Sequence, residues 1–146
     1  MKISTRGRYA LKIMMVLATA PENEFTSLKA ISEREGISMK YLEQIIALLS
    51  RAGMVESTRG KSGGYRLIKR PDEYTAGDIL RVSEGSLAPI KCVEGDSRCT
   101  NSAHCSTFAF WDGLNKAIND YIDSTTLSDL VCRQSEIGDK KARCEK

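Results

Sequence analysis

The stretch ISMKYLEQIIALLSRAGMVESTRGKSGGYRLIK, residues 37–69, decides the fold. Its first half carries apolar side chains at positions 42, 45, 46 and 49, a spacing that predicts an amphipathic helix with one buried face. Ser38 is a natural cap for the start of this helix, and Gly53 ends it. The second half predicts two strands, 54–58 and 65–69, joined by a glycine-rich loop that suits a hairpin.

Two further helices are predicted before this stretch. Residues 27–35 predict a short helix that ends at Gly36, and with the helix that follows they form a helix-turn-helix. Residues 4–19 predict the first helix, because apolar side chains recur there at helical spacing and Pro21 follows. A helix-turn-helix followed at once by a hairpin with a basic tip is a winged helix. We therefore expect a mainly α fold with a small β wing, and an unrelated helical bundle with a stray hairpin is the alternative.

The chain after the wing shows three different patterns. Residues 75–85 predict another short helix, and residues 107–123 predict a long one. Residues 86–106, between them, contain few apolar side chains and no clear period, which indicates a functional or disordered loop. The predicted organisation is a winged-helix domain at residues 1–85, a cysteine-containing loop at 86–106, a long helix and a short one at 107–132, and a flexible tail at 133–146.

The net charge of +3 conceals an asymmetry between the two halves of the chain. Residues 1–70 hold 13 Lys and Arg against 6 Asp and Glu, whereas residues 71–146 hold 9 against 13. A basic half suggests contact with a polyanion such as nucleic acid. A solvated basic surface without a partner is the alternative.

The polar side of the third helix and the wing tip supply the candidate DNA contacts. Gln44 can pair with adenine, whereas Lys40 and Arg51 suit guanine or phosphate. Arg59, at the wing tip, suits an adjacent minor groove. Any surface helix has a polar side, so the wing and the charge asymmetry are what favour DNA. The full predicted set is Ser38, Lys40, Tyr41, Glu43, Gln44, Arg51, Arg59 and Lys61.

Three members of this set have special roles. The hydroxyls of Ser38 and Tyr41, at the start of the helix, suit phosphate with the help of the helix dipole. Glu43 opposes the trend, because a carboxylate is unfavourable near phosphate unless it accepts a hydrogen bond from a cytosine amino group. We interpret Glu43 as a residue that selects among DNA sites rather than one that adds affinity.

Five cysteines are present, and three of them, Cys92, Cys99 and Cys105, fall within 14 residues. In a cytosolic chain such clustering favours metal or redox chemistry over structural disulfides. Thiolates suit zinc or iron–sulfur centres, although this spacing matches neither common zinc sites nor ferredoxin motifs. A metal-free loop or a thiol switch is the alternative.

These motifs, together with MKISTRGRYALKIM at the start, TAGDILRVSEG and STTLSDLV, resemble the IscR/CymR family of winged-helix regulators. The resemblance covers residues 1–132. It implies a homodimer in which the helix at 107–123 pairs with that of a second copy, so that two recognition helices contact double-stranded operator DNA at half-sites roughly 34–36 Å apart. The predicted apolar stripe of that helix is Phe108, Trp111, Leu114, Ile118, Tyr121 and Ile122.

The cysteine loop is similar to that of the IscR branch, which binds a [2Fe–2S] cluster, whereas the branch that regulates cysteine metabolism typically lacks these cysteines. The resemblance therefore implies cluster ligands at Cys92, Cys99 and Cys105. Two departures concern the fourth ligand: Phe108 replaces the histidine of IscR proteins, and Arg8 replaces the acidic residue of the nitric-oxide-sensing branch. The candidates for that ligand are His104, Asp96, Glu94, an exogenous group, and another cysteine. Cys132 and Cys144 are interpreted as a helix-end thiol and a tail thiol rather than as ligands.

We expect a repressor that senses iron–sulfur or redox status and controls cluster-assembly genes, and the resemblance implies that Glu43 helps to discriminate between operators. The alternative is a metal-free repressor of the same family that responds to cysteine metabolism, a thiol switch or a protein partner. A redox or metal-transfer protein would leave the wing unexplained. One histidine and no nucleophile–base pair argue against an enzyme. No signal peptide and no apolar run of roughly 20 residues is found, so we expect a cytoplasmic protein without a membrane partner.

Overall fold

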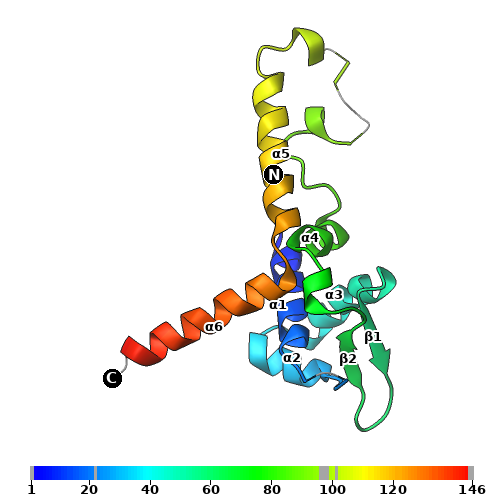
Figure 1. The fold of residues 1–146 in the computed structure, drawn as a ribbon. Helices are drawn as coiled ribbons and strands as arrows, with labels where there is room; N and C mark the ends of the chain where they lie inside the picture. The colour runs from blue at the N-terminus through cyan, green and yellow to red at the C-terminus, as the bar shows by residue number, and fades with distance from the viewer. Residues whose placement is uncertain (1, 22, 96–98, 101, 145–146) are drawn as a thin grey trace.

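The computed structural model describes residues 2–21, 23–95, 99–100 and 102–144, with side chains as far as Ile137. Figure 1 shows a winged-helix domain, a long helix that rises from it, and a C-terminal helix that extends to one side. The elements are α1 (Thr5–Ala18), α2 (Leu28–Glu35), α3 (Met39–Arg51), β1 (Val55–Thr58), β2 (Gly64–Leu67), η1 (Pro71–Glu73), α4 (Ala76–Glu84), η2 (Lys91–Val93), η3 (Ser102–His104), α5 (Phe108–Ser124) and α6 (Leu127–Cys144).

The helix-turn-helix forms as the sequence predicts. Ser27 caps α2 by accepting a hydrogen bond from the Ala30 N–H, and Gly36 ends it in the left-handed conformation at φ 65°. The predicted apolar stripe of α3 is buried against α1, α2 and α4. The largest fully buried side chains of the described residues are Ile13, Met14, Ile31, Leu42, Ile45, Leu49, Ile79 and Leu127.

The predicted wing is an antiparallel pair of strands. β1 and β2 pair in a register that sets Val55 opposite Leu67 and Thr58 opposite Gly64. Both strands are shorter than predicted, and β2 begins one residue earlier. Thr26 adds an isolated bridge to Tyr65, with two backbone hydrogen bonds of 2.9 Å. This bridge fastens the wing to the segment before α2.

The loop glycines serve two different purposes. Gly60 has φ 108°, a conformation that L side chains rarely adopt. Gly63 and Gly64 are not among the residues with positive φ, although glycine would allow that conformation at either position. They are needed for close approach instead, because a Cβ on Gly63 would strike the Thr58 carbonyl oxygen and one on Gly64 would strike that of Thr26.

Tyr74 closes the base of the wing. Its hydroxyl donates a hydrogen bond to the Met54 carbonyl oxygen at 2.9 Å and accepts one from the Lys69 N–H at 2.8 Å. The ring is buried, and this burial raises the pKa of the Tyr74 hydroxyl. The two ends of the hairpin are therefore held together by one side chain, two residues before the start of α4.

The long helix α5 contains no buried residue. At its end the chain returns to the winged-helix domain, where the Ala76 N–H donates to the Thr125 carbonyl at 2.8 Å and the Leu127 N–H donates to the Tyr74 carbonyl at 2.9 Å. The Leu127 side chain is fully buried in the domain core. Helix α5 is thus anchored by its C-terminal end.

Helix α6 differs from the sequence prediction of a flexible tail at residues 133–146, because the chain is helical as far as Cys144. The stretch contains Gln, Glu, Lys, Ala and Arg, which favour helix even without an apolar face. Asp129 supports the start of α6 by accepting hydrogen bonds from the Thr126 N–H and hydroxyl.

In Figure 1 the short helices η2 and η3 lie beside the part of α5 that is farther from the winged-helix domain, and the wing lies at the opposite end of the molecule. Over the described part of the chain, no helix is long and apolar enough to cross a membrane.

Candidate nucleic-acid interface and cysteine loop

The predicted recognition side of α3 is exposed. Lys40, Glu43, Gln44 and Arg51 are all exposed, and they line an open groove of about 590 Å³ beside α1. Arg6, at the start of α1, lines the same groove. A cation from another helix therefore stands next to the recognition side chains. The sequence analysis missed Arg6, because its place depends on how α1 packs against α3.

Two members of the predicted set behave differently from the rest. Ser38 occupies the cap position of α3, but its side chain makes no capping hydrogen bond, so the exposed hydroxyl is available to a phosphate. Tyr41 was expected to face outward. Its ring is instead partly buried and packs edge-on against Tyr9, with ring centroids 5.8 Å apart. Tyr41 lies beside the apolar stripe, and it helps to hold α3 against α1.

The wing presents two cations at its tip. Arg59 and Lys61 are both exposed in the loop between β1 and β2. Arg66, in β2, is already engaged, because it pairs with Glu56 across the strands and its guanidinium lies 4.6 Å from the centroid of the Phe25 ring. The tip residues are therefore the wing cations best placed to meet DNA.

The three clustered cysteines lie along one loop, which we call the cysteine loop (residues 86–106). Cys92 and Cys105 are exposed and Cys99 is partly exposed. The Cys99 N–H donates to the Cys92 carbonyl at 3.4 Å, which brings the backbones of these two residues together. Thr107 Oγ1 lies 3.5 Å from Cys105 Sγ, and this hydrogen bond lowers the pKa of the Cys105 thiol.

The donor set suits an iron–sulfur cluster in chemistry, because cysteine thiolates are the usual ligands of iron in such clusters. The geometry agrees in part. Cys92 and Cys99 are joined through their backbones, but within the described residues no three His, Cys, Asp or Glu side chains gather closely enough to hold a metal ion. Of the candidate fourth ligands, His104 and Cys132 are exposed, Glu94 is partly buried, and Asp96 and the Cys144 side chain lie outside the described residues.

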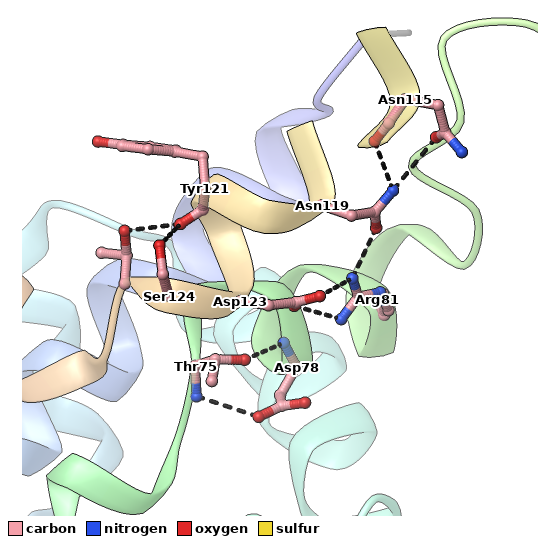
Figure 2. A network of polar contacts seen from close by, with 9 residues as sticks. Thr75, Asp78, Arg81, Asn115, Asn119, Tyr121, Asp123 and Ser124 are labelled. Carbon is pink, nitrogen blue, oxygen red and sulfur yellow. Dashed lines mark hydrogen bonds and ion pairs between the residues drawn. The ribbon is translucent and has the colours of Figure 1, made fainter. Parts of the chain in front are cut away.

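A chain of polar contacts joins the cysteine loop to α4, and Figure 2 shows its part from Asn115 to Arg81 and Asp123. Asn115 donates from Nδ2 to the carbonyl of Val93, next to Cys92, at 3.3 Å. Asn119 donates to the Asn115 carbonyl at 2.8 Å and to its side-chain oxygen at 3.2 Å. Arg81 of α4 donates to Asn119 Oδ1 at 2.7 Å, and to both carboxylate oxygens of Asp123 at 2.7 and 2.9 Å. The sequence analysis named none of these residues.

Close packing makes the last of these contacts possible. A Cβ on Gly77 would collide with Asp123 Oδ1 and with the Arg81 guanidinium. The hydrogen bond from Arg81 lowers the pKa of the Asp123 carboxyl, and the same bond raises the pKa of Arg81. Gly77, Arg81 and Asp123 thus form the joint between α4 and α5.

The apolar residues of α5 do not form the single stripe that the sequence predicts, because they fall on two sides of the helix. Phe108, Trp111, Ile118 and Ile122 are partly buried, and Asn115 and Asn119 share their side of the helix. The remaining apolar side chains are open to solvent: Phe110 is 64% exposed, Leu114 37% and Tyr121 60%. The stripe therefore divides into a side that faces the chain's own cysteine loop and a second, uncovered side.

The protein-family model described as Rrf2, iron-dependent transcriptional regulator, matches residues 3–133 of the chain. The chain belongs to the Rrf2 family. The HTH-type transcriptional regulator CymR of Bacillus subtilis (strain 168) is 43% identical over 131 residues, which cover 90% of each chain.

Solved structures of Rrf2-like regulators agree with this assignment. CymR of B. subtilis, described as the global cysteine regulator, gives a TM-score of 0.73 at 41% identity, and covers 91% of this chain and 98% of its own. IscR of T. potens gives a TM-score of 0.75 at 39% identity, and covers 94% and 90% respectively. The predicted IscR/CymR resemblance and the winged-helix fold class are confirmed. This Rrf2 chain is a transcriptional regulator and not an enzyme.

Proposed function

We propose that this Rrf2 protein is a homodimeric repressor that binds operator DNA and senses iron–sulfur or redox status through a [2Fe–2S] cluster on its cysteine loop. The observation that carries the sensing half is the set of three thiols on one loop, two of them joined by the backbone hydrogen bond between Cys99 and Cys92. Cluster-assembly genes are the proposed targets, by analogy with the IscR relatives that it resembles.

DNA binding is proposed to use the exposed side of α3 and the wing tip. Gln44, Lys40 and Arg51 would meet base edges and phosphates in the major groove, while Arg59 would enter the neighbouring minor groove. Glu43 stands in the same groove as three cations, Arg6, Lys40 and Arg51. The remaining predicted contacts are Ser38, Tyr41 and Lys61.

The operator contacts are tested with a duplex selected by the wild-type protein from a random-sequence pool. Replacing Arg59 and Lys61 together with alanine should weaken binding and lower the slope of log K against log salt by about 0.9 for each lost phosphate contact. The matched control is Lys116→Ala, which removes an exposed cation on α5. Unchanged affinity and slope in the double variant would show that the wing tip does not meet DNA.

Dimerisation is proposed to use the uncovered side of α5, which exposes Phe110, Leu114 and Tyr121. Large exposed apolar side chains on one helix favour a protein interface over open solvent. Phe110→Asp should shift sedimentation from dimer to monomer. Ile68→Asp is the matched control, because Ile68 is 50% exposed but lies outside α5. A Phe110→Asp protein that sediments like the wild type would contradict this interface.

When bound, the cluster would be the sensing group, because it would be oxidised or lost under oxidative or iron-poor conditions. Cys92, Cys99 and Cys105 would hold it, and their own part is to present thiolates, which the Thr107 hydroxyl favours at Cys105. The fourth ligand is proposed from His104, Glu94, Asp96, an exogenous group or a further cysteine. A cluster acts on DNA binding only if it stabilises one conformation more than another.

The visible spectrum of anaerobically purified protein tests the sensing half, with iron and sulfide measured on the same sample. Wild type should be red-brown, and Cys92→Ala should be colourless or nearly so. Ser106→Ala, a neighbour in the same loop without a thiol, is the control and should keep the colour. A colourless wild type that binds the selected duplex tightly would overturn cluster sensing and leave DNA binding intact.

The second candidate is a metal-free regulator of the same family that responds to cysteine metabolism, a thiol switch or a protein partner. Two observations favour it: CymR of B. subtilis is described as a cysteine regulator, and the described side chains do not gather three metal donors. Its prediction is a colourless protein whose duplex affinity changes with a thiol oxidant or with sulfur metabolites. Under either candidate, we propose that the protein acts in the cytoplasm.

A further inference from the structure

Asn115 and Asn119 are polar side chains on the partly buried side of a helix that otherwise packs with apolar groups. Buried or half-buried amides are costly unless they are paired. Both amides here are paired with groups that lie on different elements of the chain. Asn115 reaches back to the cysteine loop, and Asn119 accepts from Arg81 in the winged-helix domain. Their contacts thus bridge two regions rather than merely completing α5.

The loop end of this chain of contacts lies beside the first cysteine. Asn115 holds the carbonyl of Val93, the residue that follows Cys92. Val93 itself is buried, and η2 packs on α5. A movement of the backbone at Cys92 would therefore lengthen or break the Asn115 contact.

The other end of this chain of contacts lies in the winged-helix domain, which carries α3. Arg81 is held by Asn119 and by both oxygens of Asp123. Helix α4, which carries Arg81, packs against α1 and against α3 and buries Ile79 in their shared core. A shift of α4 therefore acts on the helices that line the recognition groove.

We propose that Asn115 and Asn119 are positioning residues that, through Arg81, couple the conformation of the cysteine loop to the position of α4 and so to DNA binding. The coupling rests on the proposed function, in that it assigns a route by which the state of the loop reaches α3. The contacts are local and sequential, and cutting any one link should uncouple the two ends. Coupling of this kind is reciprocal, so DNA binding should also steady the loop.

Two isosteric variants each remove one hydrogen-bond donor from this series of contacts. Asn115→Asp removes the amide that donates to the Val93 carbonyl. Asn119→Asp keeps the acceptor for Arg81 and removes the amide that donates to Asn115. Lys116→Ala, an exposed neighbour on α5, is the control. Thermal unfolding of all three proteins should confirm that they are folded. If one aspartate variant does not fold, the other still tests the coupling at its own link.

The first measurement is hydrogen–deuterium exchange followed by mass spectrometry on metal-free protein. Both aspartate variants should exchange faster in peptides that cover residues 87–95, and Asn115→Asp should also speed exchange in α4. Lys116→Ala should match the wild type in both regions. Unchanged exchange in the loop and in α4 for both aspartate variants would overturn the positioning role, whether or not the protein binds a cluster.

The second measurement is the ratio of duplex affinities between cluster-loaded and metal-free protein. Each aspartate variant should lower this ratio by about two- to tenfold, as expected for the loss of one intramolecular hydrogen bond, while the affinity of the metal-free form stays near wild type. An unaltered ratio in both variants, with the wild type showing a clear ratio, would overturn the coupling.

The two proposals fail in distinguishable ways. If the wild type takes up no iron and sulfide, cluster sensing fails, and exchange in α4 alone then decides whether the loop and the winged-helix domain are coupled. If the wild type loads a cluster and changes its duplex affinity, but the aspartate variants respond as it does, cluster sensing stands and this route is wrong.

Discussion

The winged-helix domain and the α5 arm (residues 86–124, the cysteine loop with α5) are built in opposite ways. The first has a continuous core, in which side chains from α1, α2, α3 and α4 are buried together. Among its described residues, the arm has two buried apolar side chains, Leu87 and Val93, and none on α5. The first region therefore holds its own shape, whereas the second depends on what it contacts: the α4 joint at one end and, as proposed, a second copy and a cluster.

This difference is tested most strongly by matched leucine truncations. Leu42→Ala, in the domain core, should lower the free energy of unfolding by about 2–5 kcal/mol, the range for fully buried leucines. Leu114→Ala, on the uncovered side of α5, should change it far less at low protein concentration. Urea unfolding at several concentrations provides the measurement. Equal losses at all concentrations would mean that the two regions are not built differently.

The link between the wing and α4 should give the next largest effect. Tyr74→Phe removes a buried hydroxyl that serves both Met54 and Lys69. We expect a loss of about 1–3 kcal/mol, because the two backbone groups are left without that partner. Proton NMR of the wing amides should also show faster exchange at Lys69. A Tyr74→Phe protein as stable as the wild type would show that the wing base is held by other contacts.

The joint between the two regions is probed by a double-mutant cycle on Gly77 and Asp123. Gly77→Ala should displace the Asp123 carboxylate and weaken the joint, although alanine by itself favours helix. In an Asp123→Ala background the same change meets no carboxylate and should be neutral or stabilising. We expect an interaction energy on the order of 1 kcal/mol, measured by urea unfolding. Additive effects would mean that Asp123 does not pack on Gly77 in solution.

The smallest expected effect is a pH dependence of the same joint. The pKa of Asp123 is lowered in the folded protein by Arg81, so the unfolded chain binds the proton more tightly. The ion pair therefore stabilises the fold above the ordinary carboxyl pKa, and this contribution is lost as the pH falls through the lowered value. Because both side chains are partly exposed, we expect less than about 1 kcal/mol.

The measurement for this pair is the unfolding free energy of wild type minus that of Asp123→Asn, followed from neutral pH into the acid range. The difference should stay constant near neutral pH and shrink on acidification. A difference that grows as the pH falls would contradict the assigned pair. High salt should reduce the difference at neutral pH, since the charges are accessible to solvent.

The sequence was sufficient for those parts of the fold in which apolar period and burial coincide. Leu42, Ile45, Ile46 and Leu49 recur at helical spacing and all lie in the core, so the helix-turn-helix could be predicted. The wing followed from its two short strands and the glycines between them. Local signals decide both features, and distant contacts are needed only to assemble them.

The sequence was insufficient where the role of a residue depends on which surface covers it. On α5 the helical period marks apolar residues without distinguishing a face that packs on the chain's own loop from one that is left open, so Leu114 and Ile118 were placed together. Asn115 and Asn119 gave no signal, because an asparagine pair four residues apart is ordinary on a solvated helix. Arg6 was missed for the same reason, since only tertiary packing brings it to α3.

The return of the chain at Thr125 and Leu127 has a consequence for how such regulators can diversify. Residues 86–124 leave the winged-helix domain after the end of α4 and come back beside its start, where backbone hydrogen bonds join Ala76 to Thr125 and Leu127 to Tyr74. Both ends of the α5 arm therefore lie beside one short helix, α4. An insertion with closely spaced ends can change in length and content at little cost to its host. We therefore expect that the α5 arm can be exchanged as a unit for segments that sense other ligands. The winged-helix domain would stay the same, because the chain enters and leaves the arm beside the two ends of α4.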